Sequence, residues 1–250
     1  MTLFTIAGRE LRALFLSPLA WTILGVLQFI TAYLFLAQLD QYMLVQPRLA
    51  GIENAPGVTD LVAAPLLGNV AVLLLLITPL LSMRLLAEEQ RSGTLSLLLA
   101  APVSMTQIVL GKYLGLLGFL GVLLLMIALM PLSLLAGGSL DLGKLAAGLL
   151  GLGLALAAFA AAGLYMSSLT AQPTVAAVSS FGLLLLVWII DWAGKSRDDA
   201  SALFGWLSLL RHYENLLKGL INSVDLVYYG LFIVTFLVLT LRRLDAKRIG

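Results

Sequence analysis

The fold is decided by residues 82–115, which read SMRLLAEEQRSGTLSLLLAAPVSMTQIVLGKYLG. Long apolar runs lie on both sides of this stretch, yet five consecutive polar residues, 88–92, interrupt them. Several adjacent charged side chains cannot stay unpaired in the hydrocarbon of a bilayer. We therefore expect the chain to emerge at a membrane surface here, between two membrane-spanning helices.

Within this stretch, the pattern predicts a short helix at the membrane surface, over residues 94–101. Gly93 is a helix stop of the kind found just after a last helical turn, and Pro102 ends the new helix after about two turns. Ser104 and Gln107 have the Ser-x-x-Gln spacing of a capping box, which predicts the start of the next long apolar helix. The short helix has a leucine-rich face, and such a face needs an apolar groove on a partner.

Three stretches of the sequence carry a family resemblance. They are residues 87–104 (AEEQRSGTLSLLLAAPVS), 163–170 (GLYMSSLT) and 212–229 (HYENLLKGLINSVDLVYY). In this order they resemble the ABC-2 family of transporter permeases, in its gliding-motility-type subgroup, and the resemblance covers nearly the whole chain. It implies that residues 94–101 form a coupling helix, which docks on a separate ATPase subunit.

The composition indicates an all-α membrane protein. Of the 250 residues, 61% are hydrophobic and 11% are charged, whereas an ordinary soluble domain has roughly 25% charged residues. The absence of cysteine excludes disulfides and thiolate metal sites, and one histidine, His212, is too few for a histidine metal cluster. We predict a polytopic protein that forms one transmembrane domain over residues 1–250.

Six apolar runs are long enough to cross a bilayer, which needs about 20 residues per helix. Before them, residues 2–16 place apolar side chains on one face and Arg9 and Arg12 opposite, as in an amphipathic interfacial helix. A secretory signal is the alternative, but the following apolar run exceeds the roughly 7–15 residues of a signal core. Residues 40–60 contain proline and glycine without a sustained period, so a loop is expected there. The predicted spans are 19–39, 61–86, 108–136, 142–169, 174–190 and 226–241.

The distribution of charge predicts the orientation. Six spans place both termini on one side of the membrane, together with the helix 94–101. That side carries nine basic and four acidic residues, a net charge of +5, and the other side carries six basic and nine acidic residues, a net charge of −3. Because basic residues are enriched in cytoplasmic loops, we expect both termini and the coupling helix to be cytoplasmic, in a bacterial plasma membrane.

Small residues recur at close spacing on the third and fourth spans. This pattern favours close helix packing, inside the subunit or between subunits, and a glycine-lined substrate path is the alternative. The glycines concerned are Gly111, Gly115, Gly118, Gly151 and Gly153.

Between the fifth and sixth spans, residues 202–222 fit two short amphipathic helices. The family resemblance implies that they form a re-entrant hairpin on the outer face, acting as a lid over the translocation path. A solvated loop that touches lipid headgroups through its aromatic residues is the alternative. The hairpin residues of interest are Phe204, Trp206, His212 and Tyr213.

The sequence lacks the motifs of catalysis. A Walker A loop requires Gly-x-x-x-x-Gly-Lys followed by serine or threonine, and the candidate at Gly111-Lys112 has Thr106 in place of the first glycine and Tyr113 in place of the hydroxyl residue. The motifs of intramembrane metalloproteases and serine hydrolases are also missing. We therefore expect no enzyme activity and no cofactor bound by this chain, with ATP and Mg²⁺ held by the partner ATPase.

These observations favour the membrane-spanning permease subunit of an ATP-driven transporter. The resemblance further implies a second copy of the permease or a related permease, and a membrane partner with a large extracytoplasmic domain. A non-transporting scaffold and a secondary carrier remain alternatives, although carriers usually need ionisable groups within their spans. The residues expected at the ATPase interface are Arg9, Arg12, Glu88, Glu89, Arg91, Gly93, Thr94, Leu95, Leu97 and Leu98.

Overall fold

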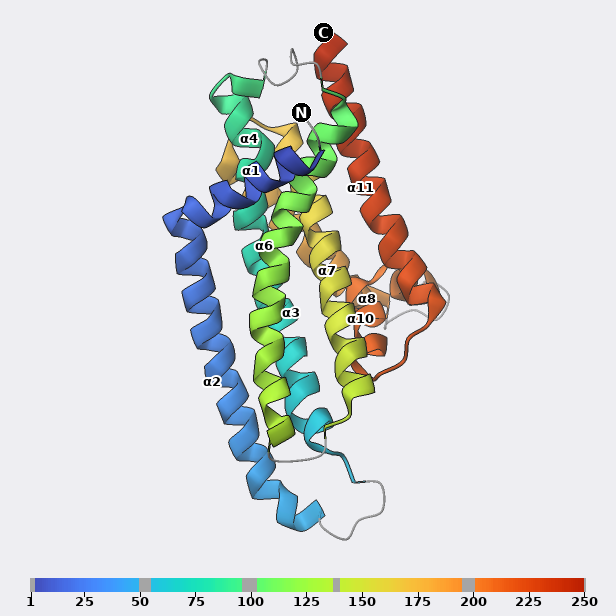
Figure 1. The fold of residues 1–250 in the computed structure, drawn as a ribbon. Coiled ribbons are helices and arrows are strands. Elements are labelled where there is room, and N and C mark those ends of the chain that lie inside the picture. Colours follow the sequence, from blue (N-terminus) through green and yellow to red (C-terminus); the bar gives the residue numbers. More distant parts are fainter. Residues whose placement is uncertain (1–2, 50–54, 96–102, 137–139, 195–200, 250) are drawn as a thin grey trace.

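The computed structural model describes residues 3–49, 55–95, 103–136, 140–194 and 201–249, which form a bundle of helices (Figure 1). Every regular element in these ranges is a helix. Six helical segments are long and apolar enough to cross a membrane, which confirms the predicted all-α polytopic fold. They are α2 (Pro18–Leu49), α3 (Ala64–Ser82) with its continuation α4 (Arg84–Arg91), α6 (Met105–Ser133), α7 (Leu142–Leu169), α8 (Pro173–Gly194) and α11 (Ser223–Ile249).

The helices are arranged around α7. Figure 1 shows both termini at one end of the bundle, where α1 (Leu3–Leu16) crosses it and α4 ends. The most apolar window of α7 is 67% buried, against 22–50% for the other five segments. It contacts α3, α6, α8, α10 and α11. Because α7 is surrounded, its alanines and glycines serve close packing on several sides.

Several helix boundaries follow from local sequence signals. The predicted capping box is present, since Gln107 N donates to Ser104 Oγ at 3.2 Å and Ser104 N donates to Gln107 Oε1 at 3.3 Å. Asp141 caps α7 by accepting from the Lys144 N–H at 3.0 Å. Gly93 follows α4 with φ of +73°, a left-handed conformation that glycine adopts without steric cost.

The predicted loop over residues 40–60 is wrong in its first half, because α2 continues to Leu49. Pro47 lies in the last turn, where its missing N–H removes one ladder bond and does not break the helix. The loop prediction gave the prolines and glycines too much weight against the continuing helical run. A π-helical turn, Thr59–Ala63, then leads into α3.

Two of the other predicted spans are also corrected. The second, 61–86, is not one helix, because Met83 separates α3 from α4. The sixth, 226–241, is too short, since α11 extends through the charged C-terminal residues to Ile249. α6 ends in a short 3₁₀ turn, Leu134–Ala136. In the predicted coupling helix, Thr94 and Leu95 are helical, and residues 96–101 lie outside the described residues.

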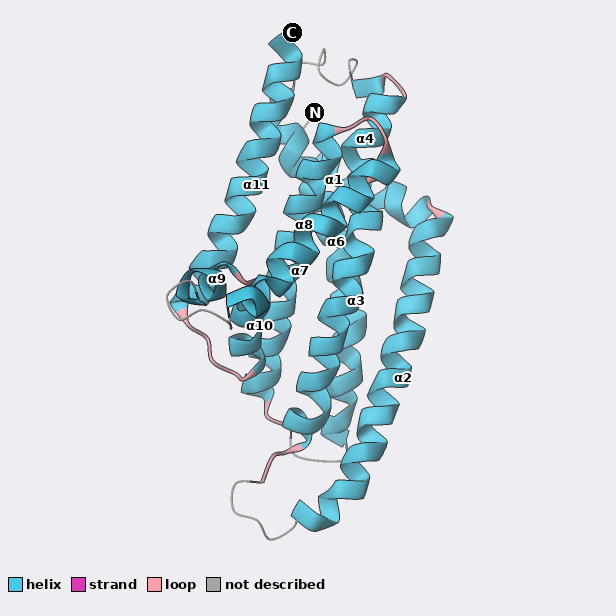
Figure 2. Ribbon diagram, turned by 180° about the vertical axis from the view of Figure 1, so that it is seen from behind, coloured by secondary structure: helices cyan, strands magenta, loops and turns pink. Residues whose placement is uncertain are grey.

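The prediction of two short helices over residues 202–222 is confirmed. They are α9 (Ser201–Leu207) and α10 (Leu209–Leu217), and Figure 2 shows them beside the bundle, between its two ends. α10 packs against the first turns of α7, where Gly151 lies beneath Leu216 and Tyr213. The two helices therefore cover part of the side of the bundle, where α10 packs on α7 and α9 on α8.

Candidate functional site

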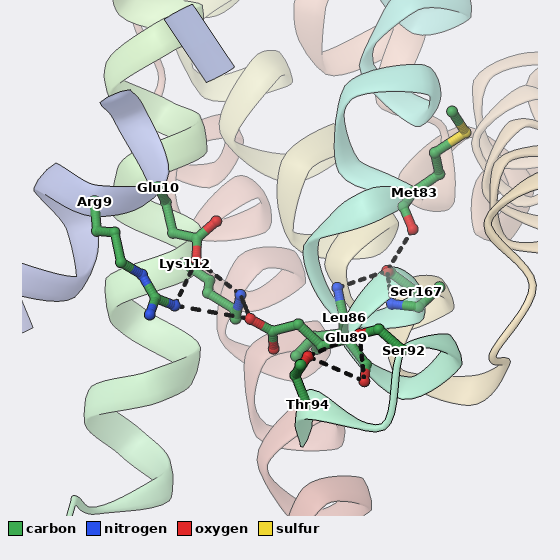
Figure 3. Close-up of polar contacts among 10 residues, drawn as sticks. Arg9, Glu10, Met83, Leu86, Glu89, Ser92, Thr94, Lys112 and Ser167 are labelled. Carbon is green, nitrogen blue, oxygen red and sulfur yellow. Dashed lines mark hydrogen bonds and ion pairs between the residues drawn. The ribbon is translucent and has the colours of Figure 1, made fainter. Parts of the chain in front are cut away.

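A buried lysine lies where α1, α4 and α6 meet. The side chain of Lys112, on α6, is 1% exposed, and its Nζ lies 2.9 Å from Glu10 Oε1 and 2.7 Å from Glu89 Oε1 (Figure 3). The Arg9 guanidinium lies 3.3 Å from Glu10 and 3.8 Å from Glu89. Two cations thus face two carboxylates, which is the arrangement that makes buried charge tolerable. We call these four residues the charged joint.

The glycines of α6 explain how Glu10 reaches Lys112. A Cβ atom at Gly115 would lie 2.6 Å from Glu10 Cβ and 2.9 Å from the Ala7 carbonyl oxygen, and one at Gly111 would lie 2.7 Å from Ile6. Gly118 faces Leu11 in the same way. The prediction of close packing holds for these glycines, but their partner is the interfacial helix α1 and not another span.

A serine from α7 fixes the break between α3 and α4. An unbroken helix would pair the Ala87 N–H with the Met83 carbonyl. The Ala87 and Leu86 N–H groups donate to Ser167 Oγ at 3.0 and 3.1 Å, and the Ser167 hydroxyl donates to the Met83 carbonyl at 2.9 Å (Figure 3). A side chain that inserts into the backbone ladder is an established cause of a helix kink. The direction of α4 is therefore set by α7.

The last carbonyls of α7 are bound by α4 and α11. Gln90 Nε2 donates to the Ser168 carbonyl at 3.0 Å, and Lys247 Nζ donates to the same carbonyl at 3.1 Å and to Gln90 Oε1 at 2.6 Å. Carbonyls at the end of a helix have no intrahelical partner, so these contacts satisfy them. The stretch 163–170 also places Gly163 against Ser82 of α3, because a Cβ atom there would meet Ser82 Oγ.

The exposed end of α4 follows the charged joint directly. Glu88, Arg91 and Thr94 are exposed, and the hydroxyls of Ser92 and Thr94 lie 2.8 Å apart. Next to it, a hollow of about 930 Å³ opens between α4 and the turn that joins α7 to α8, lined in part by Arg84 and Gln172. This surface offers charges of both signs at the end of the bundle that carries the termini.

The residues predicted at the ATPase interface therefore fall into three groups. Glu88, Arg91, Gly93, Thr94 and Arg12 are exposed at this end. Glu89 and Arg9 lie in the charged joint, and Leu95 is 7% exposed and belongs to the core. Leu97 and Leu98 lie outside the described residues.

A second polar cluster lies between the hairpin helices and the start of α11. His212 Nδ1 lies 2.5 Å from Asp225 Oδ1, and the imidazole stacks on Tyr228 with ring centroids 4.0 Å apart. Tyr213 is fully buried and donates to the Leu67 carbonyl at 2.9 Å. Of the other two predicted hairpin residues, Trp206 is 50% exposed and Phe204 is partly buried.

Sequence reasoning did not identify Lys112, Ser167 or Asp225 as functional residues. Their partners are distant in sequence or, for Asp225, across a turn: Lys112 and Glu10 are 102 residues apart. One signal was present, because a lysine inside an apolar run and between two glycines must find a counter-charge.

Gly153 differs from the other predicted packing glycines, since its nearest neighbour is the flexible end of Leu124 at 3.5 Å.

The fold and the joint together define a polytopic helical membrane protein with an interfacial N-terminal helix and a kinked second span. The comparison with family models identifies it further. The chain belongs to the ABC-2 family: the family model described as ABC-2 family transporter protein matches residues 4–248. No curated protein matched the chain. The match covers nearly the whole chain.

Proposed function

We propose that this chain is the permease subunit of an ATP-driven transporter and that it couples ATP hydrolysis by a separate ATPase subunit to substrate movement. Family membership over residues 4–248 supports the permease class. The charged joint carries the rest of the proposal, because it ties the exposed end of α4 to both α1 and α6. In this scheme the ATPase subunit holds ATP and Mg²⁺, and the chain binds no cofactor itself.

The joint gives the coupling a mechanical basis. Removing one partner of a buried ion pair costs about 3–5 kcal/mol, so Glu89 and Lys112 resist separation. A push on the end of α4 therefore moves α1 and α6 with it. Ser167 and Gln90 extend the connection to α7, the central helix of the bundle.

The proposed setting is a bacterial plasma membrane with both termini in the cytoplasm. The net charge of +5 on the terminal side supports this orientation, and both termini lie at one end with α4 (Figure 1). Six spans are half of a usual transmembrane unit of this family, so we propose pairing with a second copy or a related permease. The gliding-motility-type subgroup and a partner with a large extracytoplasmic domain rest on the sequence resemblance.

The test reverses charge at the exposed end of α4. Glu88 contacts Arg84 at 4.0 Å, with side chains that are 59% and 50% exposed, so Glu88→Lys with Arg91→Glu leaves the fold intact. We expect this double variant, and separately Leu97→Asp with Leu98→Asp, to lower ATPase co-purification at least tenfold, since a few contacts dominate binding. Membrane insertion is measured in parallel.

The matched control is Arg48→Glu, at the exposed end of α2 remote from the termini. It should leave ATPase co-purification unchanged. If both interface variants purify with the ATPase subunit and with normal ATP turnover, the coupling proposal is wrong. A transport activity that needs a proton or sodium gradient and no ATPase would instead favour a secondary carrier.

A further inference from the structure

Two neighbouring cavities lie beside the hairpin helices, and they differ in chemistry. The first, of about 390 Å³, is bounded by α9, α10 and the first turn of α11, and its polar lining includes Arg211, His212, Asn215 and Asp225. The second, of about 280 Å³, lies between α8, α9 and α11. Trp206 lines both cavities. Together they reach the size range of ligand sites, roughly 300–1,000 Å³.

Within the polar cavity, His212 and Asp225 neutralise each other. His212 Nε2 lies 2.9 Å from the Trp206 carbonyl oxygen, which can only accept, so this nitrogen carries a proton. Nδ1 faces the Asp225 carboxyl, and one further proton lies between these two groups. Asn215 Nδ2 also donates to Asp225 at 3.4 Å. Whichever atom holds the shared proton, the pair has no net charge.

Arg211 therefore gives the polar cavity its net positive charge. Among the described residues its guanidinium forms no ion pair. The guanidinium lies against the backbone of Gly205, where a Cβ atom would be 1.9 Å from Nη1. Its position thus depends on the absence of a side chain at residue 205. An arginine held in this way can bind a phosphate or carboxylate through two parallel hydrogen bonds.

The second cavity is almost wholly apolar. Its walls are formed by Val187 and Ile190 of α8 and by Leu231, Phe232 and Phe236 of α11. Both helices are candidate membrane spans, so the slot lies between segments that are apolar enough to face hydrocarbon chains. Trp206, 50% exposed, and Tyr228 stand between the slot and the polar cavity, with ring centroids 5.9 Å apart.

We propose that this pair of cavities is a binding site for an anionic amphiphile, a molecule with a hydrocarbon chain and a phosphate or carboxylate head. The head binds Arg211, and the chain lies against Phe232 and Phe236. A free anion would use the first cavity alone, and a neutral lipid the second alone. The adjacency of a positive cavity and an apolar slot favours a ligand that carries both groups.

The test uses the fluorescence of Trp206 in the full-length chain. Trp21→Phe, Trp188→Phe and Trp192→Phe leave Trp206 as the sole tryptophan. The protein is placed in phosphatidylcholine vesicles that contain rising fractions of phosphatidylglycerol with brominated chains, which quench tryptophan on contact. We expect saturable quenching at a low mole fraction, and weak, linear quenching by brominated phosphatidylcholine.

Two variants separate the head site from the chain site. Arg211→Gln removes the charge and should raise the half-saturating fraction on the order of tenfold, the effect of one lost charge-assisted hydrogen bond. Thr235→Phe fills the apolar slot, which Thr235 lines, and should weaken binding with Arg211 intact. The matched control Arg48→Gln, at the end of α2, should leave the curve unchanged.

Three results would overturn the proposal. Equal quenching by the two lipids would show an ordinary lipid contact, and so would an unchanged curve in Arg211→Gln. Inorganic phosphate is added at about 10 mM, a concentration on the order of the dissociation constant of a weak anion site. If it displaces the brominated lipid, the cavity binds a free anion. If the triple tryptophan variant does not fold, native mass spectrometry of the wild-type chain and Arg211→Gln counts the retained phosphatidylglycerol molecules, and an equal count rejects the site.

Discussion

The charged joint and the hairpin both attach surface helices to the bundle, but they do so with different chemistry. In the joint, Lys112 shares two carboxylates from two other helices. Besides the His212–Asp225 pair, the hairpin region contains three tyrosine hydroxyls that each donate to one backbone carbonyl. These contacts are Tyr213 to Leu67 at 2.9 Å, Tyr228 to Leu207 at 2.6 Å and Tyr229 to Leu209 at 3.1 Å.

This difference predicts different responses to force and to mutation. Charges that share partners are coupled, so the loss of one changes the energy of the others. Contacts made one at a time to backbone carbonyls are more independent and more nearly additive. The joint should therefore move as a unit, whereas the tyrosine contacts of the hairpin can loosen one after another. The three predictions below test this contrast, from the largest expected effect to the smallest.

The first prediction concerns the centre of the joint. Lys112→Met leaves Glu10 and Glu89 facing each other without their buried counter-charge, and it should lower the free energy of unfolding by about 3–5 kcal/mol. Thermal unfolding in mild detergent measures the loss. Adding Glu10→Gln and Glu89→Gln to the same chain should restore most of the stability, because no unpaired buried charge then remains.

The control for this prediction is the exposed pair Arg84–Glu88, with side chains 50% and 59% exposed. Arg84→Met should change stability by less than about 1 kcal/mol. A Lys112→Met variant as stable as the Arg84→Met variant would show that the joint is not a coupled unit. The same conclusion would follow if the triple variant were less stable than Lys112→Met alone.

The second prediction concerns the kink beside the joint. Ser167→Ala removes the acceptor of the Leu86 and Ala87 N–H groups, and it should cost about 1–3 kcal/mol as these donors lose their partner. Hydrogen exchange should become faster at these two amides. Ser168→Ala is the matched control, since within the described ranges the Ser168 hydroxyl bonds to its own helix, at the Tyr165 carbonyl, at 2.6 Å. Equal exchange in the two variants would argue against a serine-held kink.

The third prediction concerns the hairpin. Tyr213→Phe removes one hydrogen bond to the Leu67 carbonyl and should cost about 0.5–1.5 kcal/mol. Faster hydrogen exchange should be confined to α10, with α4 unaffected. Tyr33→Phe, at a side chain 66% exposed, serves as the control and should have no effect. A change in exchange that spread to α4 would show that the hairpin and the joint are not separate units.

The sequence predicted what is local and missed what is distant. The capping box of α6, the stop at Gly93 and the two hairpin helices depend on residues close together in the chain, and all three are present in the structure. The glycines of α6 predicted a close approach, but nothing local showed that α1 would occupy it. Periodicity alone cannot identify which helix packs against the glycine face of α6, because any amphipathic helix could cover it.

The charged joint shows that local sequence also cannot predict which charged residues pair with each other. Glu89 was predicted to contact the ATPase subunit because the family resemblance placed the coupling helix beside it, and the alternative was a charge that only solvates the end of a span. It is directed inward because Lys112, 23 residues later, returns to the same level of the bundle. A rule that every lysine in an apolar run needs a carboxylate would have predicted a pair, although the choice between Glu88, Glu89 and Glu10 required the fold.

The length of α2 determines how far the protein extends beyond the bilayer. Its 32 residues make a rod of roughly 48 Å, and the hydrocarbon layer is about 30 Å thick. Tilting the whole rod into that layer would need an angle of roughly 50°, beyond the range of about 0–40° seen for membrane helices. Part of α2 must therefore extend beyond the hydrocarbon layer. Figure 1 shows that the end of α2 remote from the termini lies at the far tip of the bundle. A molecule that approaches the protein from that side therefore contacts this end of α2 among the first parts of the described structure.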